Sequence, residues 1–320
     1  MRQIEPIPLE AIRSARDRIS GVATRTPLIR LNVDNAPSEV YLKLENLQPI
    51  GSFKLRGAAN AMALADADEL AGGVYTASAG NMAQGVAYVA RQRGIDCSVV
   101  VPENSPRTKL AAIERLGAHT IMVSYDEWWK VLIEHRFPGL TGKFIHPVCD
   151  PDVIAGNGTI GLEILDDLPD VETIIVPYGG GGLSSGIASA VNALRPRTRI
   201  YAAEVETAAP LAASLAAGSP QTIDHTPSFV DGIGGKSLLP EMWNLVRSVL
   251  DGSLVVSLSQ IAEAIRLLIE RNRIVAEGAG ASSAAAALAG KAGTGRTVCV
   301  ISGGNIDAAK LITILGGDLP

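Results

Sequence analysis

Short apolar runs alternate with helical segments along most of this chain, and this alternation is its strongest constraint on fold. The expected strands lie at residues 40–45, 74–78, 98–101, 120–123, 173–177, 199–203, 254–256 and 297–301. The expected helices lie at residues 8–20, 58–64, 83–93, 106–116, 126–135, 156–168, 183–194, 258–272 and 279–289. Apolar strands without polar alternation suit parallel sheets that helices cover on both faces. The pattern predicts an α/β fold with open parallel sheets flanked by helices.

The strand–helix rhythm breaks near residues 138–142, where proline, glycine and threonine cluster. We therefore expect a small domain at residues 71–142, inserted into a large domain made of residues 1–70 and 143–320. A chain of 320 residues has room for two domains. The last expected strand ends near residue 301, and we expect no further domain after it.

Composition narrows the function class. Lys and Arg number 28 against 33 Asp and Glu, so nothing favours a nucleic-acid partner. Cys97, Cys149 and Cys299 are widely spaced, which excludes a disulfide framework and a cysteine zinc site and fits a reducing cytoplasm. No run of 18 apolar residues exists, and the first residues lack the apolar core of a leader peptide. These features favour a cytoplasmic enzyme with a small-molecule substrate.

Four consecutive glycines separate the strand at 173–177 from the helix that follows it. Backbone N–H groups of such a turn can converge on an anion, and the helix dipole adds to the attraction. A flexible turn is the alternative, but a tight strand–helix turn rarely needs four glycines. We predict a phosphate site at Gly179, Gly180, Gly181 and Gly182.

Two other phosphate motifs fail on spacing. The dinucleotide fingerprint needs a third glycine where this chain has Ser184 or Ser185. A P-loop ending at residues 235–237 would begin with glycine at the position that Val230 occupies. Neither a dinucleotide nor a nucleoside triphosphate is therefore indicated.

A lysine stands at an unusual place after the strand at 40–45. Ser52 is a good N-cap, which puts Lys54 in the first turn of the following helix. The positive end of a helix disfavours a cation and lowers the pKa of a nearby amine, so that more of it is neutral and nucleophilic. A lysine that merely extends into solvent is the commoner alternative for this segment alone.

Two further turns follow strands. Residues 78–85, Ser-Ala-Gly-Asn-Met-Ala-Gln-Gly, open a helix and offer N–H groups to a carboxylate, although simple helix capping explains them equally well. Residues 302–305, Ser-Gly-Gly-Asn, end the last buried strand, so Ser302 lies at the carboxyl edge of the sheet, where open α/β folds bind ligands.

In this order, the lysine after Gly-Ser-Phe, the Ser-Ala-Gly-Asn turn, the tetraglycine loop and the terminal Ser-Gly-Gly-Asn form one pattern. The chain resembles the fold-type II pyridoxal-phosphate enzymes, of tryptophan synthase β-like fold, and within them the serine/threonine dehydratase and serine racemase group. The resemblance spans roughly residues 10–310 and includes the segments 154–159 and 275–277.

The resemblance implies a role for each motif. Lys54 would hold pyridoxal 5′-phosphate as a Schiff base and later take the substrate's Cα proton. Phe53 would pack on the pyridine ring, Asn81 would bond its 3′ oxygen, and Ser302 would meet its nitrogen. The phosphate would lie on residues 179–182 and the N–H of Leu183. The residues expected to hold the substrate carboxylate are Ser78, Ala79, Gly80, Asn81 and Met82.

Several positions depart from the group's pattern. Met82 replaces a usual histidine, which favours an apolar or unusual substrate side chain, and Asn157 replaces a usual glutamine. Trp128 and Trp129 could line an aromatic pocket, although surface or domain packing is the simpler expectation. The cation site of some relatives uses a glutamate, here Glu204, and an acid six residues on; Pro210 stands there, so we expect no metal.

These features predict a homodimeric ammonia-lyase that eliminates water from a β-hydroxy amino acid, threonine- or serine-like or bulkier. The products are ammonia and a 2-oxo acid. Racemisation and β-replacement are the alternatives within the family; a phosphate-ligand-binding protein without catalysis is the alternative outside it. Racemases of this group place a serine at the position of Ala79, whose methyl group cannot carry a proton.

Overall fold

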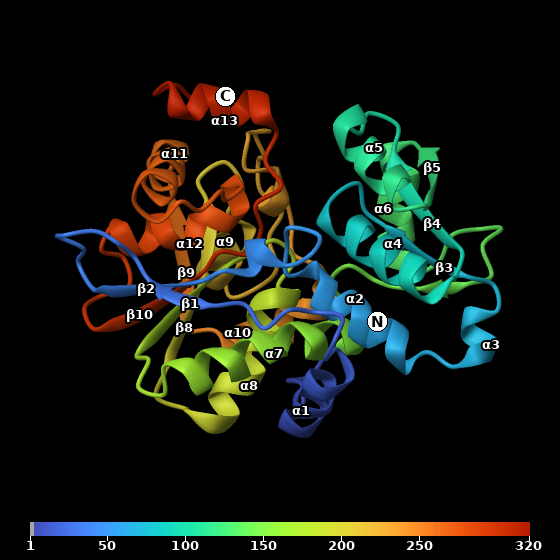
Figure 1. Cartoon of the computed structure of the whole chain (residues 1–320), viewed down its shortest axis with the longest axis horizontal. Coiled ribbons are helices and arrows are strands. Elements are labelled where there is room, and N and C mark those ends of the chain that lie inside the picture. Colours follow the sequence, from blue (N-terminus) through green and yellow to red (C-terminus); the bar gives the residue numbers. More distant parts are fainter. Residues whose placement is uncertain (1–2) are drawn as a thin grey trace.

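The computed structural model describes residues 3–320, which form two bodies, each built around its own sheet (Figure 1). The strands are β1 (Leu28–Arg30), β2 (Glu39–Lys43), β3 (Val74–Ala77), β4 (Cys97–Pro102), β5 (His119–Val123), β6 (Lys143–Phe144), β7 (Thr173–Pro177), β8 (Arg199–Val205), β9 (Gly252–Val256) and β10 (Arg296–Val300). The α-helices are α1 (Leu9–Arg18), α2 (Lys54–Leu64), α3 (Ala67–Leu70), α4 (Asn81–Arg93), α5 (Arg107–Arg115), α6 (Tyr125–Glu134), α7 (Pro151–Asp167), α8 (Gly182–Leu194), α9 (Pro210–Ala217), α10 (Trp243–Val249), α11 (Leu258–Leu267), α12 (Gly278–Leu288) and α13 (Ala308–Leu315).

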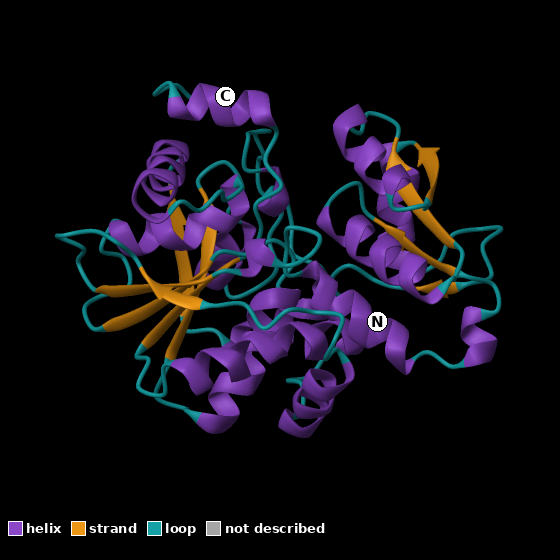
Figure 2. Cartoon of the chain, viewed as in Figure 1, coloured by secondary structure: helices purple, strands orange, loops and turns teal. Residues whose placement is uncertain are grey.

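The larger sheet has six strands in the order β1-β2-β10-β7-β8-β9. Only β1, at one edge, runs antiparallel to its neighbour, and the other pairs are parallel. Helices cover both faces of this sheet: α7, α8 and α10 on one, α11 and α12 on the other (Figure 2).

Strand β7 shows why both faces are apolar. Successive side chains of a strand point to opposite faces. Ile174 and Val176 accordingly pack in the core with α7 and α8, whereas Ile175 packs with α11 and α12. All three are fully buried, which explains the unbroken apolar run of this strand.

The smaller sheet has four parallel strands in the order β5-β4-β3-β6. Val99 and Val101 of β4 face α4, while Val100 packs with Leu132 of α6. The strand β6 lies just past the expected return of the chain near residue 142. The division into domains at 70/71 and 142/143 stays a prediction.

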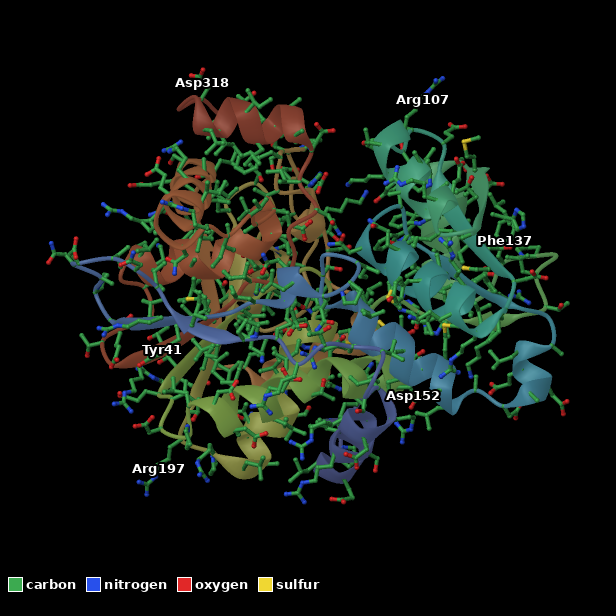
Figure 3. The ribbon with its side chains drawn as sticks, in the orientation of Figure 1. Tyr41, Arg107, Phe137, Asp152, Arg197 and Asp318 are labelled. Carbon is green, nitrogen blue, oxygen red and sulfur yellow. The ribbon has the colours of Figure 1, made fainter. Side chains whose placement is uncertain are left out.

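The predicted fold class is confirmed, and the predicted strands and helices agree with the structure to within a few residues at most ends. Helices α3, α9, α10 and α13 lie in stretches for which no helix was expected. Charged side chains such as Arg107, Arg197 and Asp318 project from the surface (Figure 3). Within residues 3–320, no helix combines the length and apolar character needed to cross a bilayer.

Candidate active site

Lys54 is the first residue of α2, between the two bodies. Its Nζ donates a hydrogen bond of 2.7 Å to the carbonyl oxygen of Pro147 and lies 5.2 Å from the centre of the Phe53 ring. Burial lowers the pKa of Lys54 to about 8, although part of the side chain remains reachable from solvent. Loss of hydration is the cause of this shift, in the direction that the sequence analysis expected.

The start of α2 differs from the expected capping. Phe53, not Ser52, is the N-cap residue, and no side chain caps the helix. The Ser52 hydroxyl is buried without a hydrogen-bond partner among the described residues. Ser52 instead makes a β-bridge to Gly303, and the Phe53 N–H donates to the Ser302 carbonyl at 3.0 Å. This pairing fixes Lys54 beside the carboxyl end of β10.

The tetraglycine turn joins β7 to α8 at the same sheet edge. Gly181 is the N-cap of α8 and has a φ of +96°, a conformation that glycine adopts readily. Within residues 3–320, the N–H groups of Gly179, Gly180 and Gly181 donate no hydrogen bond to protein. Free N–H groups at a helix N-terminus form an anion site.

The space around this turn leaves no room for larger residues. A β-carbon on Gly180 would lie 2.7 Å from the Val148 side chain, and one on Gly181 would lie 2.9 Å from Val246. Asn157 donates to the Gly182 carbonyl at 3.4 Å, and its own side-chain oxygen, buried, has no partner among the described residues. The turn is therefore a fixed cradle, and its unused N–H groups fit a phosphate group, whose oxygens accept hydrogen bonds.

The turn at residues 78–82 begins α4 and faces α12 across the two bodies. The Gly80 N–H donates to the Ser78 hydroxyl at 3.2 Å, and a β-carbon on Gly80 would meet nothing within 4 Å. Ala79 packs against the core of the smaller body. The Met82 side chain is 1% exposed and lies in that core. Its place beside the substrate stays a prediction.

Asn81 links the turn to the larger body. Its side-chain nitrogen donates to Glu277 at 2.9 Å, and its oxygen accepts from Asn305 at 2.8 Å. Burial, helped by the charge of Asp231, raises the pKa of Glu277 to about 7. Sequence reasoning assigned Glu277 no role; its only signal was the segment 275–277 in the family pattern.

Glu204 is not arranged as an open cation ligand. Its two carboxylate oxygens accept 2.8 Å hydrogen bonds from the N–H groups of Leu211 and Ala212, and Ser253 donates to it at 2.5 Å. Glu204 thus caps α9, which begins with Pro210. Burial raises the pKa of Glu204. Glu204 therefore stabilises the first turn of α9 at the sheet edge.

Trp129 of α6 packs between the two bodies, and Trp128 packs against the core of the smaller one. Trp129 contacts the cores of both, and its ring centre lies 6.2 Å from that of Trp128. This confirms the domain-packing interpretation over an aromatic pocket.

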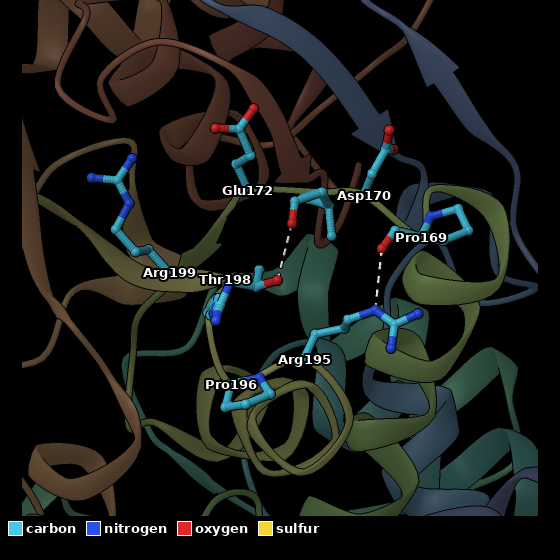
Figure 4. A pocket seen from close by; sticks show the side chains of 9 residues that line it. Pro169, Asp170, Glu172, Arg195, Pro196, Thr198 and Arg199 are labelled. Atoms are coloured by element: carbon cyan, nitrogen blue, oxygen red, sulfur yellow. Dashed lines mark hydrogen bonds between the residues drawn. The ribbon is translucent and has the colours of Figure 1, made fainter.

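A hollow of about 480 Å³ lies elsewhere, at the amino edge of the larger sheet (Figure 4). It opens between the segments before β7 and β8. There Arg195 donates to the Pro169 carbonyl at 3.3 Å, and the Thr198 hydroxyl donates to that of Val171 at 3.0 Å. The motif residues meet at the opposite, carboxyl edge, which is where open α/β sheets bind ligands. The candidate site is therefore this carboxyl edge, where the Lys54 segment, the glycine turn and the turn at residues 78–82 come together.

Known proteins resemble this chain over most of its length. The family model described as "Pyridoxal-phosphate dependent enzyme" matches residues 19–303. The L-threonine ammonia-lyase of Thermotoga maritima is 41% identical over 98% of this chain and 79% of its own length. The catabolic L-threonine dehydratase of Escherichia coli (strain K12) is 38% identical over 97% of both chains. The structure of maize serine racemase superimposes with a TM-score of 0.86, 32% identity and 98% coverage of each chain.

Proposed function

The chain belongs to the pyridoxal-phosphate dependent enzymes, and from this premise we propose that it is an ammonia-lyase acting on threonine and serine. One observation carries the proposal. At one sheet edge, the Lys54 amine, with its lowered pKa, lies near a glycine turn whose N–H groups donate no hydrogen bond within the described residues. Identity near 40% to threonine ammonia-lyases over nearly the whole chain supports the substrate class.

The residues fit the cofactor. The N–H groups of residues 179–182 and Leu183 would hold its phosphate, and Phe53 would pack on its ring. Asn81 would hydrogen-bond its 3′ oxygen, and Ser302 would meet its ring nitrogen. Bound there, pyridoxal phosphate supplies an electron sink for negative charge at the substrate's Cα. Because a serine hydroxyl does not favour a protonated ring nitrogen, this sink is weak, which suits elimination of a β-substituent.

Lys54 has the properties of a general base. With a pKa of about 8, part of its amine is neutral at physiological pH and can accept the Cα proton. The turn at residues 78–82 would hold the substrate carboxylate. Loss of the Cα proton and the β-hydroxyl removes water, and release of the amine as ammonia takes water back, so the net products are a 2-oxo acid and ammonia.

Racemisation is the second candidate, supported by the similarity to serine racemases. Racemisation needs a proton carrier on each face of Cα. Lys54 would serve one face, and the methyl group of Ala79 cannot carry a proton on the other. We also propose a homodimer in the cytoplasm; the three free, buried cysteines fit a reducing compartment. Sedimentation of the purified protein at several concentrations tests the dimer.

The test of function is a panel of L-threonine, L-serine and bulkier β-hydroxy amino acids, scored for ammonia and 2-oxo acid in equal amounts. We expect turnover of threonine and serine, which Lys54→Ala abolishes. Absence of 2-oxo acid from every substrate, in a protein that carries pyridoxal phosphate, would refute the lyase assignment.

A further inference from the structure

One turn supports both halves of the candidate site. Residues 146–149 connect β6 to α7, and the Pro147 carbonyl in this turn accepts the hydrogen bond from Lys54 at 2.7 Å. The next residue, Val148, lies against the glycine cradle: a β-carbon on Gly180 would be 2.7 Å from its side chain, and one on Gly182 would be 3.1 Å from its carbonyl. The shape of this turn therefore sets where the amine and the cradle lie relative to each other.

His146 holds that turn in shape. Its Nδ1 accepts hydrogen bonds from the N–H groups of Val148 at 3.0 Å and Cys149 at 2.7 Å. Because Nδ1 accepts twice, the ring hydrogen is on Nε2, which donates to the Leu132 carbonyl at 3.1 Å. Both ring nitrogens are thus occupied, and the side chain is 2% exposed.

The surroundings of the ring make it a fixed anchor rather than a proton carrier. The His135 ring lies 4.5 Å away and the Phe144 ring 5.7 Å away, centre to centre. Burial, helped by the neighbouring His135 and Lys54, lowers the pKa of His146 to about 3. The imidazole remains neutral wherever the protein is folded at ordinary pH, so its hydrogen bonds do not change with pH.

We propose that His146 is a positioning residue of the active site: its Nδ1 acceptor holds the 146–149 turn so that Pro147 receives the Lys54 amine and Val148 supports the glycine cradle. This inference rests on the proposed function, because it takes Lys54 and the cradle as the binding site for pyridoxal phosphate. The hydrogen bonds of His146 go to backbone groups, so it acts through the turn.

Two matched substitutions separate the acceptor from the donor of the ring. His146→Asn places a side-chain oxygen near the position of Nδ1, so it can accept from both N–H groups but loses the donor to Leu132. His146→Gln places an N–H near the position of Nε2, so it keeps that donor and loses the acceptor. The full-length variants are compared with wild type in pyridoxal phosphate affinity, in the pH titration of the bound cofactor's absorbance, in turnover and in thermal unfolding.

Leaving two buried N–H groups unpaired should weaken pyridoxal phosphate binding in His146→Gln by about tenfold or more and move the absorbance titration, with the fold intact. His146→Asn should stay within about threefold of wild type in affinity, because its acceptor is retained. Equal behaviour of the two variants would overturn the inference, whether both match wild type or both fail. So would outright unfolding of His146→Gln, because the proposed effect is confined to the turn. A wild-type protein that binds no pyridoxal phosphate would instead refute the proposed function itself.

Discussion

Replacing Arg56 by methionine should strongly destabilise the protein, because Arg56, two residues after Lys54 in α2, balances buried charge. Its guanidinium is buried and donates to both oxygens of Glu45, each at 2.8 Å, and to both oxygens of Glu163 at 2.7 and 2.9 Å. Lys43, also fully buried, donates to Glu163 at 2.6 Å. Two cations and two carboxylates thus cancel inside the protein.

Without Arg56, two carboxylates face a single lysine in the interior. Removing one partner of a buried pair costs about 3–5 kcal/mol, because the other charge is left desolvated and unpaired. That is a large part of the roughly 5–15 kcal/mol that stabilise a typical folded protein. Methionine fills a similar volume, so the loss should come mainly from charge.

Urea unfolding at pH 7 measures the effect, with Arg56→Met, Glu45→Gln and the double variant forming a thermodynamic cycle. The double variant leaves Lys43 paired with Glu163 and no net charge. We therefore expect it to lose about 1–3 kcal/mol less unfolding free energy than the sum of the losses in the two single variants. A single Arg56→Met variant that loses less than about 1 kcal/mol, or a cycle without coupling, would refute the reasoning.

The change in stability on acidification tests the same interaction independently, and its direction follows from the pKa of Glu45. Burial raises the pKa of Glu45, but the charge and hydrogen bonds of Arg56 outweigh it, and the pKa lies below its ordinary value. In wild type Glu45 therefore adds stability at neutral pH, which is lost as the pH falls through its folded pKa. In Arg56→Met mainly burial remains, so the folded pKa should rise, and the deficit against wild type should shrink between about pH 7 and pH 5.

Three further predictions concern the chemistry. Ala79→Ser should raise whatever racemisation the enzyme shows by supplying a proton carrier on the second face of Cα, which proton NMR in deuterated water measures; an unchanged rate contradicts it. Chelators should leave turnover unaffected, because the oxygens of Glu204 are engaged in capping α9; a large loss that magnesium restores would show the opposite. Because burial lowers the pKa of Lys54 to about 8, labelling of its amine in protein stripped of cofactor should titrate with a midpoint near that value. A midpoint near that of free lysine would show that the amine is fully hydrated.

The fold was readable from sequence because its signals are local. An apolar stretch such as residues 173–177, followed by four glycines and a helical segment, predicts a strand, a turn and a helix in almost any context. Local signals gave the wrong helix cap at Ser52. Serine is a good helix cap by propensity, but the backbone of Ser52 pairs with Gly303, from the far end of the chain, and Ser52 does not cap α2. Long-range strand pairing outweighed the local preference.

The supporting polar residues of the site could not be predicted, because each depends on partners far away in sequence. Lys43 and Arg56 look like ordinary surface charges until Glu163, 107 residues beyond Arg56, is brought against them. The burial of the Met82 side chain depends on how α4 packs on the smaller sheet, which its place in a motif does not show. His146 carried no spacing signal, since its partners are mainly backbone groups.

The central claim is that Lys54 is the residue that holds pyridoxal phosphate. Borohydride treatment of the purified yellow protein fixes the cofactor to the amine that carries it, and peptide mass spectrometry then locates the modified lysine. We predict a single modified peptide containing Lys54, and no modified peptide from Lys54→Ala treated in the same way. A modification at another lysine, or a wild-type protein that takes up no pyridoxal phosphate, would contradict the account.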